Sequence, residues 1–207
     1  MVFTLLAGFS VANAETLRIT ALGDSLTAGY GLAQGEGLVP QLQAWLQARG
    51  HDVSVQNAGV SGDTTSGGLS RLDWTLGDHP QAMIVALGGN DLLRGIDPAL
   101  SRANLDAILT RLDADGIPAL LVGLFAPGNY GPEYQAQFAA MYPDLAAAHG
   151  ALLMPDLLAP ITTQVATGIA STDLMQGDMI HPNPQGVALV VAALGPLVED
   201  LIARITH

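Results

Sequence analysis

Two residues far apart in the sequence, Ser25 and His181, have the chemistry of a nucleophile and a base. Ser25 follows an apolar run at an expected strand-to-helix turn, where its hydroxyl can be exposed and a helix N-terminus favours developing negative charge. His181 stands three residues after Asp178, in a short turn that Pro182 keeps extended. One rigid loop can therefore carry a base and the carboxylate that holds its tautomer. These residue types are those of nucleophilic catalysis by a hydroxyl.

Each of these residues also has a structural interpretation. Ser25 taken alone fits a plain N-cap better than a nucleophile, and an isolated His is more often structural than catalytic. The other histidines have no carboxylate at such spacing, and we expect them on the surface: His51, His79, His149 and His207. No two of the five histidines have metal-ligand spacing on one helix, and the chain has no Cys, so we expect neither a metal nor a cofactor.

Other polar residues imitate catalytic motifs. The segment 59–63 is similar to the G-x-S-x-G elbow of α/β-hydrolases, but Asp63 stands where the last Gly is required. That elbow is therefore absent, and we expect Ser61 to be a turn residue. Asp24, Asp63 and Asp91 each border an expected helix start, where a carboxylate caps backbone amides. We therefore assign them structural roles.

The composition limits the classes of function. A chain of 207 residues, with 49% hydrophobic and 13% charged residues, can bury a core and fits one domain of ordinary size. Seven basic residues, all Arg, stand against 19 acidic ones, which gives a net charge of -12. Such a surface repels phosphate backbones and anionic lipid headgroups, so we expect no nucleic-acid partner.

The first 14 residues differ from the rest. Val2 to Val11 is a short apolar run, and Ala12-Asn13-Ala14 has the form of a secretory cleavage site. The run is far shorter than the roughly 20 residues that cross a bilayer, so we expect no stable membrane anchor. No basic residue precedes it, which leaves a buried N-terminal strand as the alternative. We interpret residues 1–14 as the remnant of a signal peptide and 15–207 as a single exported domain, periplasmic or secreted.

Short apolar runs alternate with amphipathic stretches along the rest of the chain. The runs predict strands buried on both faces of a parallel sheet: Leu17–Leu22, Val53–Gln56, Ala82–Leu87, Pro118–Leu124 and Ala151–Met154. The stretches between them predict helices: 38–50, 97–116, 131–149 with Pro143 as a kink or break, and 183–206. This alternation predicts an α/β fold with helices on both faces of a five-stranded parallel sheet.

Ligands of such sheets bind beyond the carboxyl ends of the strands. The polar, Gly-rich segments of this chain stand at those places: 23–27, 57–63, 88–91 and, before the last helix, 178–183.

Four of these blocks, in this order, resemble the SGNH (GDSL) serine hydrolases. Gly-Asp-Ser-Leu at 23–26 is similar to the nucleophile block, Gly62 to the glycine block, 88–91 to the asparagine block and 178–182 to the Asp-x-x-His block. GDSL alone is a weak signal, whereas the joint match over residues 23–182 is specific. Further matches at 63–64, 92–95 and 129–131 resemble the bacterial exported subgroup with acyl-CoA thioesterase, arylesterase and lysophospholipase activities.

The resemblance implies a flavodoxin-like three-layer α/β/α sandwich and a role for each matched residue. It implies that Ser25 attacks an acyl carbonyl, that His181 is the general base and that Asp178 orients the imidazole. It also implies an oxyanion hole made by the backbone N–H groups of Ser25 and Gly62 and by the side-chain amide of Asn90. A neutral hydroxyl nucleophile and a tetrahedral oxyanion need these parts on chemical grounds too.

Three segments are expected to rim the cleft: 31–37, 92–98 and 125–132. An acyl chain is a plausible occupant, contacting residues of these segments and of the His loop: Leu92, Leu93, Phe125, Tyr130 and Met179. The alternative is that each packs against a neighbouring helix. A Lys-free domain at -12 offers little steering to polyanionic coenzyme A. We therefore expect carboxylic esters or lysophospholipids to be nearer the working substrate than acyl-CoA thioesters.

Two other functions remain as alternatives. A carbohydrate acetylesterase on the same scaffold would need a polar, open cleft, which the apolar rim opposes. A non-catalytic binding module is disfavoured because every chemical position holds the required residue type. We expect a monomeric enzyme that acts on a small-molecule acyl ester or thioester.

Overall fold

The computed structural model describes residues 16–205, which fold around a five-stranded sheet. All strands are parallel, in the order β2-β1-β3-β4-β5. Their bounds are β1 Leu17–Gly23, β2 Val53–Gly59, β3 Ala82–Ala86, β4 Ala119–Val122 and β5 Leu152–Met154. The α/β class and the parallel five-stranded sheet are confirmed.

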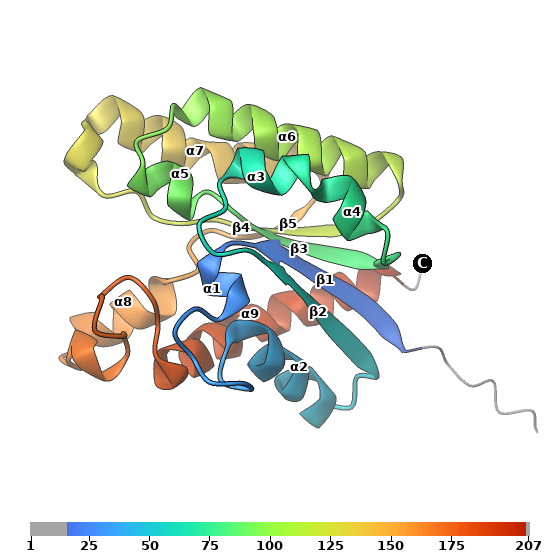
Figure 1. Cartoon of the computed structure of the whole chain (residues 1–207), viewed down its shortest axis with the longest axis horizontal. Coiled ribbons are helices and arrows are strands. Elements are labelled where there is room, and N and C mark those ends of the chain that lie inside the picture. Colours follow the sequence, from blue (N-terminus) through green and yellow to red (C-terminus); the bar gives the residue numbers. More distant parts are fainter. Residues whose placement is uncertain (1–15, 206–207) are drawn as a thin grey trace, which may run out of the picture.

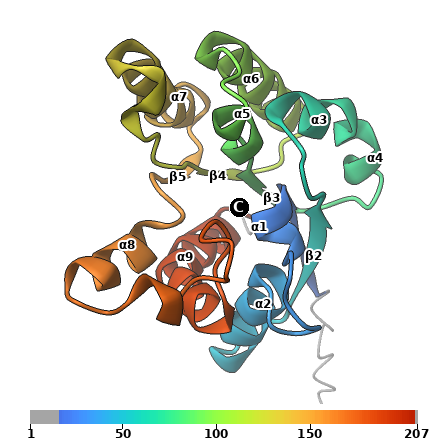
Figure 2. The ribbon, with the colours of Figure 1, turned by 60° about the vertical axis from the view of Figure 1, so that its left-hand side comes forward.

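Helices cover both faces of the sheet, as Figures 1 and 2 show. One face carries α2 (Leu38–Ala48), α8 (Ala159–Ala166) and α9 (Pro184–Ile205). The other carries α3 (Thr65–Ser70), α4 (Leu72–Leu76), α6 (Pro98–Ala114) and α7 (Pro132–His149). Two short helices lie at the carboxyl ends of strands: α1 (Ser25–Ala28) after β1 and α5 (Gly89–Leu93) after β3. The layers are those of a three-layer sandwich.

Side chains of the central strands alternate between two hydrophobic clusters, because successive residues of a strand point to opposite faces. In β3, Ala82, Ile84 and Ala86 pack with α2 and α9, whereas Met83 and Val85 pack with α6 and α7. Both sets are apolar, so the central strands appear in the sequence as continuous apolar runs. The edge strand β2 buries Val53 and Val55 and exposes Ser54 and Gln56.

The strand bounds differ from the prediction mainly in β2, which continues to Gly59 instead of ending at Gln56. The polar residues Asn57 to Gly59, predicted as loop, pair with Ala21 to Gly23 of β1. Backbone hydrogen bonds of the ladder extend the strand past its apolar residues, because pairing does not require an apolar side chain.

The helix boundaries follow the expected signals. Asp97 caps α6 by accepting a hydrogen bond from Ala99 N, Pro98 is the first helical residue, and Gly150 ends α7 in the left-handed conformation. Pro143 does not break α7, which continues from Pro132 to His149. Burial of Phe138, Tyr142 and other side chains on both sides of Pro143 keeps the helix continuous.

The C-terminal helix α9 is long and apolar enough, by length and composition, to cross a membrane. In the fold, 50% of its most apolar stretch is buried. The buried side chains, among them Val190, Leu194, Val198 and Leu201, belong to the cluster shared with α2 and the sheet. This helix is a core element of the domain.

Two histidines have carboxylate partners that their sequence context did not indicate. His51 Nε2 lies 2.8 Å from Glu199 Oε1. His149 lies between two carboxylates, with Nδ1 at 2.6 Å from Asp113 Oδ2 and Nε2 at 3.0 Å from Asp106 Oδ1. The expectation of surface histidines without partners is wrong for both, because the partners come from elements distant in sequence. His207 lies outside the described residues.

The carboxylates around His149 predict a pH-dependent contribution to stability. Partial burial lowers the pKa of His149, but hydrogen bonds with Asp113 and Asp106 outweigh it and raise that pKa above its ordinary value. The charged form is therefore favoured by folding, so its contribution is complete below the unfolded pKa of about 6.5 and is lost as pH rises through the folded pKa. We expect the melting temperature of wild type relative to His149→Gln to fall between about pH 6 and about pH 9. A difference that stays constant over that range would contradict the ion pairs.

Candidate active site

The nucleophile candidate Ser25 is the first residue of α1, at the carboxyl end of the central strand β1. Asp24 is the N-cap of this helix, and its side chain accepts a hydrogen bond from Leu26 N at 3.0 Å. The N-cap interpretation of Ser25 is therefore wrong, and the structural role expected of Asp24 is confirmed. With the cap provided by Asp24, the hydroxyl of Ser25 makes its hydrogen bond with His181.

Ser25, His181 and Asp178 form one continuous chain of hydrogen bonds. Ser25 Oγ lies 2.8 Å from His181 Nε2, and His181 Nδ1 lies 2.7 Å from Asp178 Oδ2. With Nδ1–H donating to the carboxylate, Nε2 faces the hydroxyl as an acceptor. The spacing expected from Asp178 and His181 thus brings a base within reach of a serine that is 156 residues earlier in the chain.

The loop that carries Asp178 and His181 is folded around the carboxylate. Asp178 Oδ1 accepts hydrogen bonds from Ile180 N at 2.9 Å and from His181 N at 3.0 Å. The His181 backbone N–H, the His181 side chain and the Ile180 N–H lower the pKa of Asp178 to about 2. Met179, which lies between Asp178 and Ile180, has a φ of 58°, a value that a non-glycine residue rarely adopts. The carboxylate is therefore ionised and fixed over the whole pH range in which an imidazole titrates.

Tyr30 and Gln176 hold this loop against the segment that follows α1, and the sequence analysis did not identify either. Gln176 Nε2 donates to Tyr30 O at 2.8 Å and to Pro182 O at 3.0 Å. The ring of Tyr30 lies 4.8 Å from that of His181. The sequence offered one signal for Gln176: it stands two residues before Asp178, in the same loop.

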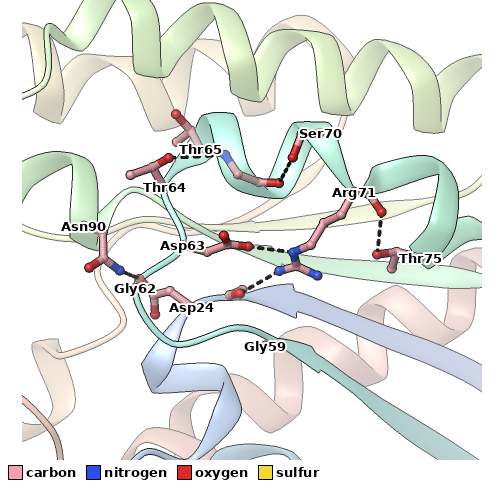
Figure 3. A network of polar contacts seen from close by, with 12 residues as sticks. Asp24, Gly59, Gly62, Asp63, Thr64, Thr65, Ser70, Arg71, Thr75 and Asn90 are labelled. Carbon is pink, nitrogen blue, oxygen red and sulfur yellow. Dashed lines mark hydrogen bonds and ion pairs between the residues drawn. The ribbon is translucent and has the colours of Figure 1, made fainter.

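The two other residues predicted for the oxyanion hole follow neighbouring strands: Gly62 lies in the loop after β2, and Asn90 lies in α5 after β3. Asn90 Nδ2 donates to Asp24 Oδ2 at 3.3 Å (Figure 3). Gly62 has a φ of +87°, and its carbonyl accepts a hydrogen bond from Arg94 Nη2 at 2.8 Å. Burial raises the pKa of Asp24, opposed by the hydrogen bond from Leu26 N. The amide of Asn90 thus contacts the carboxylate that caps α1, directly before Ser25 in the chain.

Arg71 ties the glycine loop to the end of β1. Its Nε donates to Asp63 Oδ2 at 2.6 Å (Figure 3). Its Nη2 donates to Gly23 O at 3.0 Å. Asp63 was expected to cap a helix, but Thr64 is the N-cap of α3. Asp63 instead pairs with the guanidinium, which the helix-start pattern did not reveal. Its role is structural, as expected, through a different interaction. Ser61 lies in a turn, as predicted.

Asp91 organises the helices behind the site. It is 1% exposed and accepts hydrogen bonds from Thr65 N at 2.8 Å, Thr65 Oγ1 at 2.6 Å and Ser101 Oγ at 2.9 Å. These partners belong to α3 and α6, so one carboxylate on α5 joins three helices. Asp91 therefore accepts a hydrogen bond from the first amide of α3 and does not cap α5, the helix to which it belongs. Its structural role is confirmed.

An apolar pocket of about 330 Å³, including its open mouth, adjoins Ser25 and His181. Its walls come from α1 and the following loop, the start of α2, the Leu157-Leu158 segment and α9. The five residues predicted to contact an acyl chain are not among its walls. Leu93, Phe125, Tyr130 and Met179 are instead 44–66% exposed. Among the described residues, no group of three His, Asp or Glu side chains could hold a metal ion.

Two glycines without side chains allow α1 to lie against the end of the sheet. A Cβ on Gly59 would be 2.3 Å from Ala28 N, in the backbone of α1. A Cβ on Gly23 would be 2.0 Å from Thr27 Oγ1 of α1 and 2.9 Å from Ala86 O of β3. The two backbone atoms, Ala28 N and Ala86 O, cannot rotate away as a side chain does. The position of Ser25 thus depends on the absence of these two side chains.

We expect Gly59→Ala to destabilise the fold by about 1–3 kcal/mol, the usual effect of overpacking, and to lower activity by moving α1. Gly128→Ala is the matched control, since its nearest neighbour would be a side-chain atom, Gln135 Oε1, at 3.6 Å. Urea unfolding gives the stability of both variants. Equal stability of Gly59→Ala and the control would show that α1 does not need the close approach.

Comparisons with known proteins agree with this geometry. The sequence profile of the GDSL-like Lipase/Acylhydrolase family matches residues 21–189. Esterase TesA of Pseudomonas aeruginosa is 40% identical over 193 residues, which cover 92% of this chain and 91% of TesA. Thioesterase 1/protease 1/lysophospholipase L1 of Escherichia coli K12 is 35% identical over 201 residues, covering 97% and 91% of the two chains.

Solved structures share the fold. AlinE4, an SGNH-hydrolase family esterase, has a TM-score of 0.73 and 44% identity over 90% of this chain and 96% of its own. A crystal structure of TesA has a TM-score of 0.79 and 36% identity over 89% and 99% of the two chains. Because the family profile matches most of this chain, the chain belongs to the GDSL-like lipase/acylhydrolase family and is a serine hydrolase that acts on ester bonds.

Proposed function

We propose that the chain hydrolyses carboxylic esters and thioesters of acyl groups through an acyl-enzyme on Ser25, with His181 as general base and Asp178 as its orienting carboxylate. The observation that carries this proposal is the chain of hydrogen bonds from Ser25 Oγ through both imidazole nitrogens to Asp178, with distances of 2.8 and 2.7 Å. A hydroxyl hydrogen-bonded to a base that is itself oriented by a carboxylate is the arrangement that activates a serine nucleophile.

In the acylation step, Ser25 Oγ forms a bond to the carbonyl carbon while His181 Nε2 takes the hydroxyl proton. Negative charge then develops on the carbonyl oxygen, which the N–H groups of Ser25 and Gly62 and the amide of Asn90 stabilise. His181 gives its proton to the leaving alcohol or thiol as the bond to the carbonyl carbon breaks. The ionised Asp178 stabilises the imidazolium that exists between the two transfers.

In the deacylation step, water takes the place of the alcohol. His181 removes a proton from the water as its oxygen attacks the acyl carbon, and returns the proton to Ser25 Oγ when the ester bond to the enzyme breaks. Asn90 is held near the reacting carbon because its amide also contacts Asp24 at 3.3 Å. That hydrogen bond is long and therefore weak, so the amide of Asn90 can turn from Asp24 toward an oxyanion at a small energetic cost.

Esters of apolar acyl groups suit the surface around the site better than acetylated carbohydrates. Leu93, at the end of α5, and Phe125 and Tyr130, in the segment after β4, are 59%, 66% and 44% exposed. Exposed apolar side chains beside a catalytic centre favour an acyl chain, whereas a sugar would need polar partners. A carbohydrate acetylesterase remains the second candidate, and acetate-only activity would favour it.

Acyl-CoA is expected to be a poorer substrate than uncharged esters. Of the two arginines beside the motif loops, Arg71 is engaged with Asp63 and Gly23 O, so Arg94 is left as the cation that faces the glycine loop. We expect the kcat/KM for aryl and lysophospholipid esters to exceed that for palmitoyl-CoA, measured side by side in the same buffer. A value for palmitoyl-CoA far above the others would contradict this preference.

We further propose that residues 15–207 act as one monomeric domain exported from the cytoplasm. Residues 1–14, with their apolar run and small-x-small site, lie outside the described residues. The similarity to TesA and to the thioesterase of Escherichia coli supports the same activity but not a compartment. Mass spectrometry of the N-terminus of the protein recovered from a bacterial host tests the cleavage after Ala14.

The role of Ser25 is tested by hydrolysis of p-nitrophenyl esters from acetate to palmitate, by residues 15–207 and by Ser25→Ala. We expect the variant to lose essentially all turnover because the hydroxyl that is hydrogen-bonded to His181 Nε2 is that of Ser25. Retained folding, measured by circular dichroism, is the control. Equal rates in both proteins would exclude Ser25 as the nucleophile.

The role of Asn90 is tested by Asn90→Ala. Removal of one oxyanion donor lowers kcat by about 100- to 1000-fold, with a much smaller effect on KM, because the interaction is made in the transition state. Steady-state kinetics with p-nitrophenyl butyrate measure both constants. A kcat within a few-fold of wild type would remove Asn90 from the oxyanion hole.

A further inference from the structure

The apolar pocket beside Ser25 lies on one particular side of the proposed reaction centre. Its walls include Ser25 and His181, but neither Gly62 nor Asn90. Apart from Ser25, His181, Tyr30 and Gln176, the side chains that line it are aliphatic and come from separate parts of the chain, among them Leu26, Leu32, Leu158 and Val190. The pocket therefore opens toward the imidazole and away from the expected oxyanion donors.

The chemistry of ester cleavage decides which part of a substrate can enter this pocket. The carbonyl oxygen must point to Gly62 and Asn90, where the oxyanion donors are. The alcohol oxygen must lie next to His181 Nε2, because this atom gives it the proton that it needs to leave. The substituent on that oxygen therefore extends past the imidazole, on the side where the pocket opens.

We propose that this pocket is the subsite for the leaving group and that it takes an apolar alcohol portion, such as a phenyl or small branched alkyl group. The inference rests on the proposed function of Ser25 and His181. In the step concerned, the bond between the carbonyl carbon and the alcohol oxygen breaks, and the proton from Ser25 passes through His181 to that oxygen. A neutral alcohol is released in the pocket and the acyl group stays on Ser25.

The walls also fix the chemical class of the leaving group. Aliphatic side chains provide no partner for a charged or strongly polar alcohol, which would lose its hydration without compensation. The glycerophospho group of a lysophospholipid is such an alcohol, so we expect aryl esters to be cleaved with a higher kcat/KM than lysophospholipids. Gln176 is at the wall, but its amide already donates to Tyr30 O and Pro182 O. The acyl chain then lies on the opposite side, toward the exposed Leu93, Phe125 and Tyr130. One site thus separates the two halves of an ester.

Leu158 is the residue at which the pocket is best altered. It lines the pocket, is only partly buried, and stands at the start of α8, away from Ser25 and the loop of His181. Leu158→Phe reduces the space and Leu158→Ala enlarges it. Leu32, also partly buried at the wall, provides a second position through Leu32→Phe if the first variant is unstable. Leu100→Phe, on the exposed face of α6, is the matched control.

Two ester series separate the leaving group from the acyl group. One series keeps the acetyl group and changes the alcohol from methanol to phenol and 2-naphthol. The other keeps methanol and changes the acid from acetic to hexanoic and decanoic. We expect Leu158→Phe to lower kcat/KM for the aryl acetates about tenfold or more relative to methyl acetate. The methyl ester series should change less than about twofold, and Leu158→Ala should favour 2-naphthyl acetate.

Two results would overturn the assignment of the pocket. Loss confined to the long-chain methyl esters would make the pocket an acyl site. Equal changes in both series, or none, would make it a packing gap without a role in specificity. Failure of wild type to hydrolyse any ester, or full activity of Ser25→Ala, would instead overturn the proposed function, which distinguishes the two kinds of failure.

Discussion

The close approach of α1 to the end of the sheet is the constraint on which the rest of the site depends. Gly23 and Gly59 are paired in the β1–β2 ladder, and a Cβ on either would overlap backbone of α1 or of β3. Because both side chains are absent, the helix begins directly on the strand ends, and Ser25 stands at a fixed height above the sheet. Asp24 caps the same turn, so one dipeptide provides both the helix start and the candidate nucleophile.

Other polar contacts hold the surrounding loops in place next to Ser25. Arg71 joins Asp63 to Gly23 O, Gln176 joins the loop of His181 to Tyr30 O, and Asp91 joins three helices behind the site. Each of these side chains hydrogen-bonds to a backbone group at or near the end of a strand or helix. The chemistry thus occurs among residues whose positions are set by hydrogen bonds to the main chain.

The sequence predicted the parts whose physical cause is local. Apolar runs located all five strands, and cap and glycine signals located the long helices, because burial and chain conformation act over a few residues. Helix starts were expected near Asp63 and Asp91, where α3 and α5 lie, but without bounds for either helix. The short helices α4 and α8 were not predicted, since tertiary contacts hold them in place of an apolar face of their own. The partners of Asp63, His51 and His149 were missed for a related reason, because these contacts depend on the fold. The partner of Asp63 is 8 residues away in the sequence and that of His51 is 148 residues away, and the two partners of His149 are 36 and 43 residues away. The apolar pocket likewise combines segments from both ends of the chain.

The order of elements along the chain has a consequence for biosynthesis. The cluster under β1 and β2 is completed by Val187, Val191 and further side chains of α9, the last helix. A ribosome releases these residues last, so the nascent chain cannot close this half of its core while it is being made. The loop of His181 directly precedes α9, and the hydroxyl of Ser25 stays without its base for the same period. Until α9 has been made, a growing chain therefore has neither a closed cluster on this face of the sheet nor a hydroxyl next to a base.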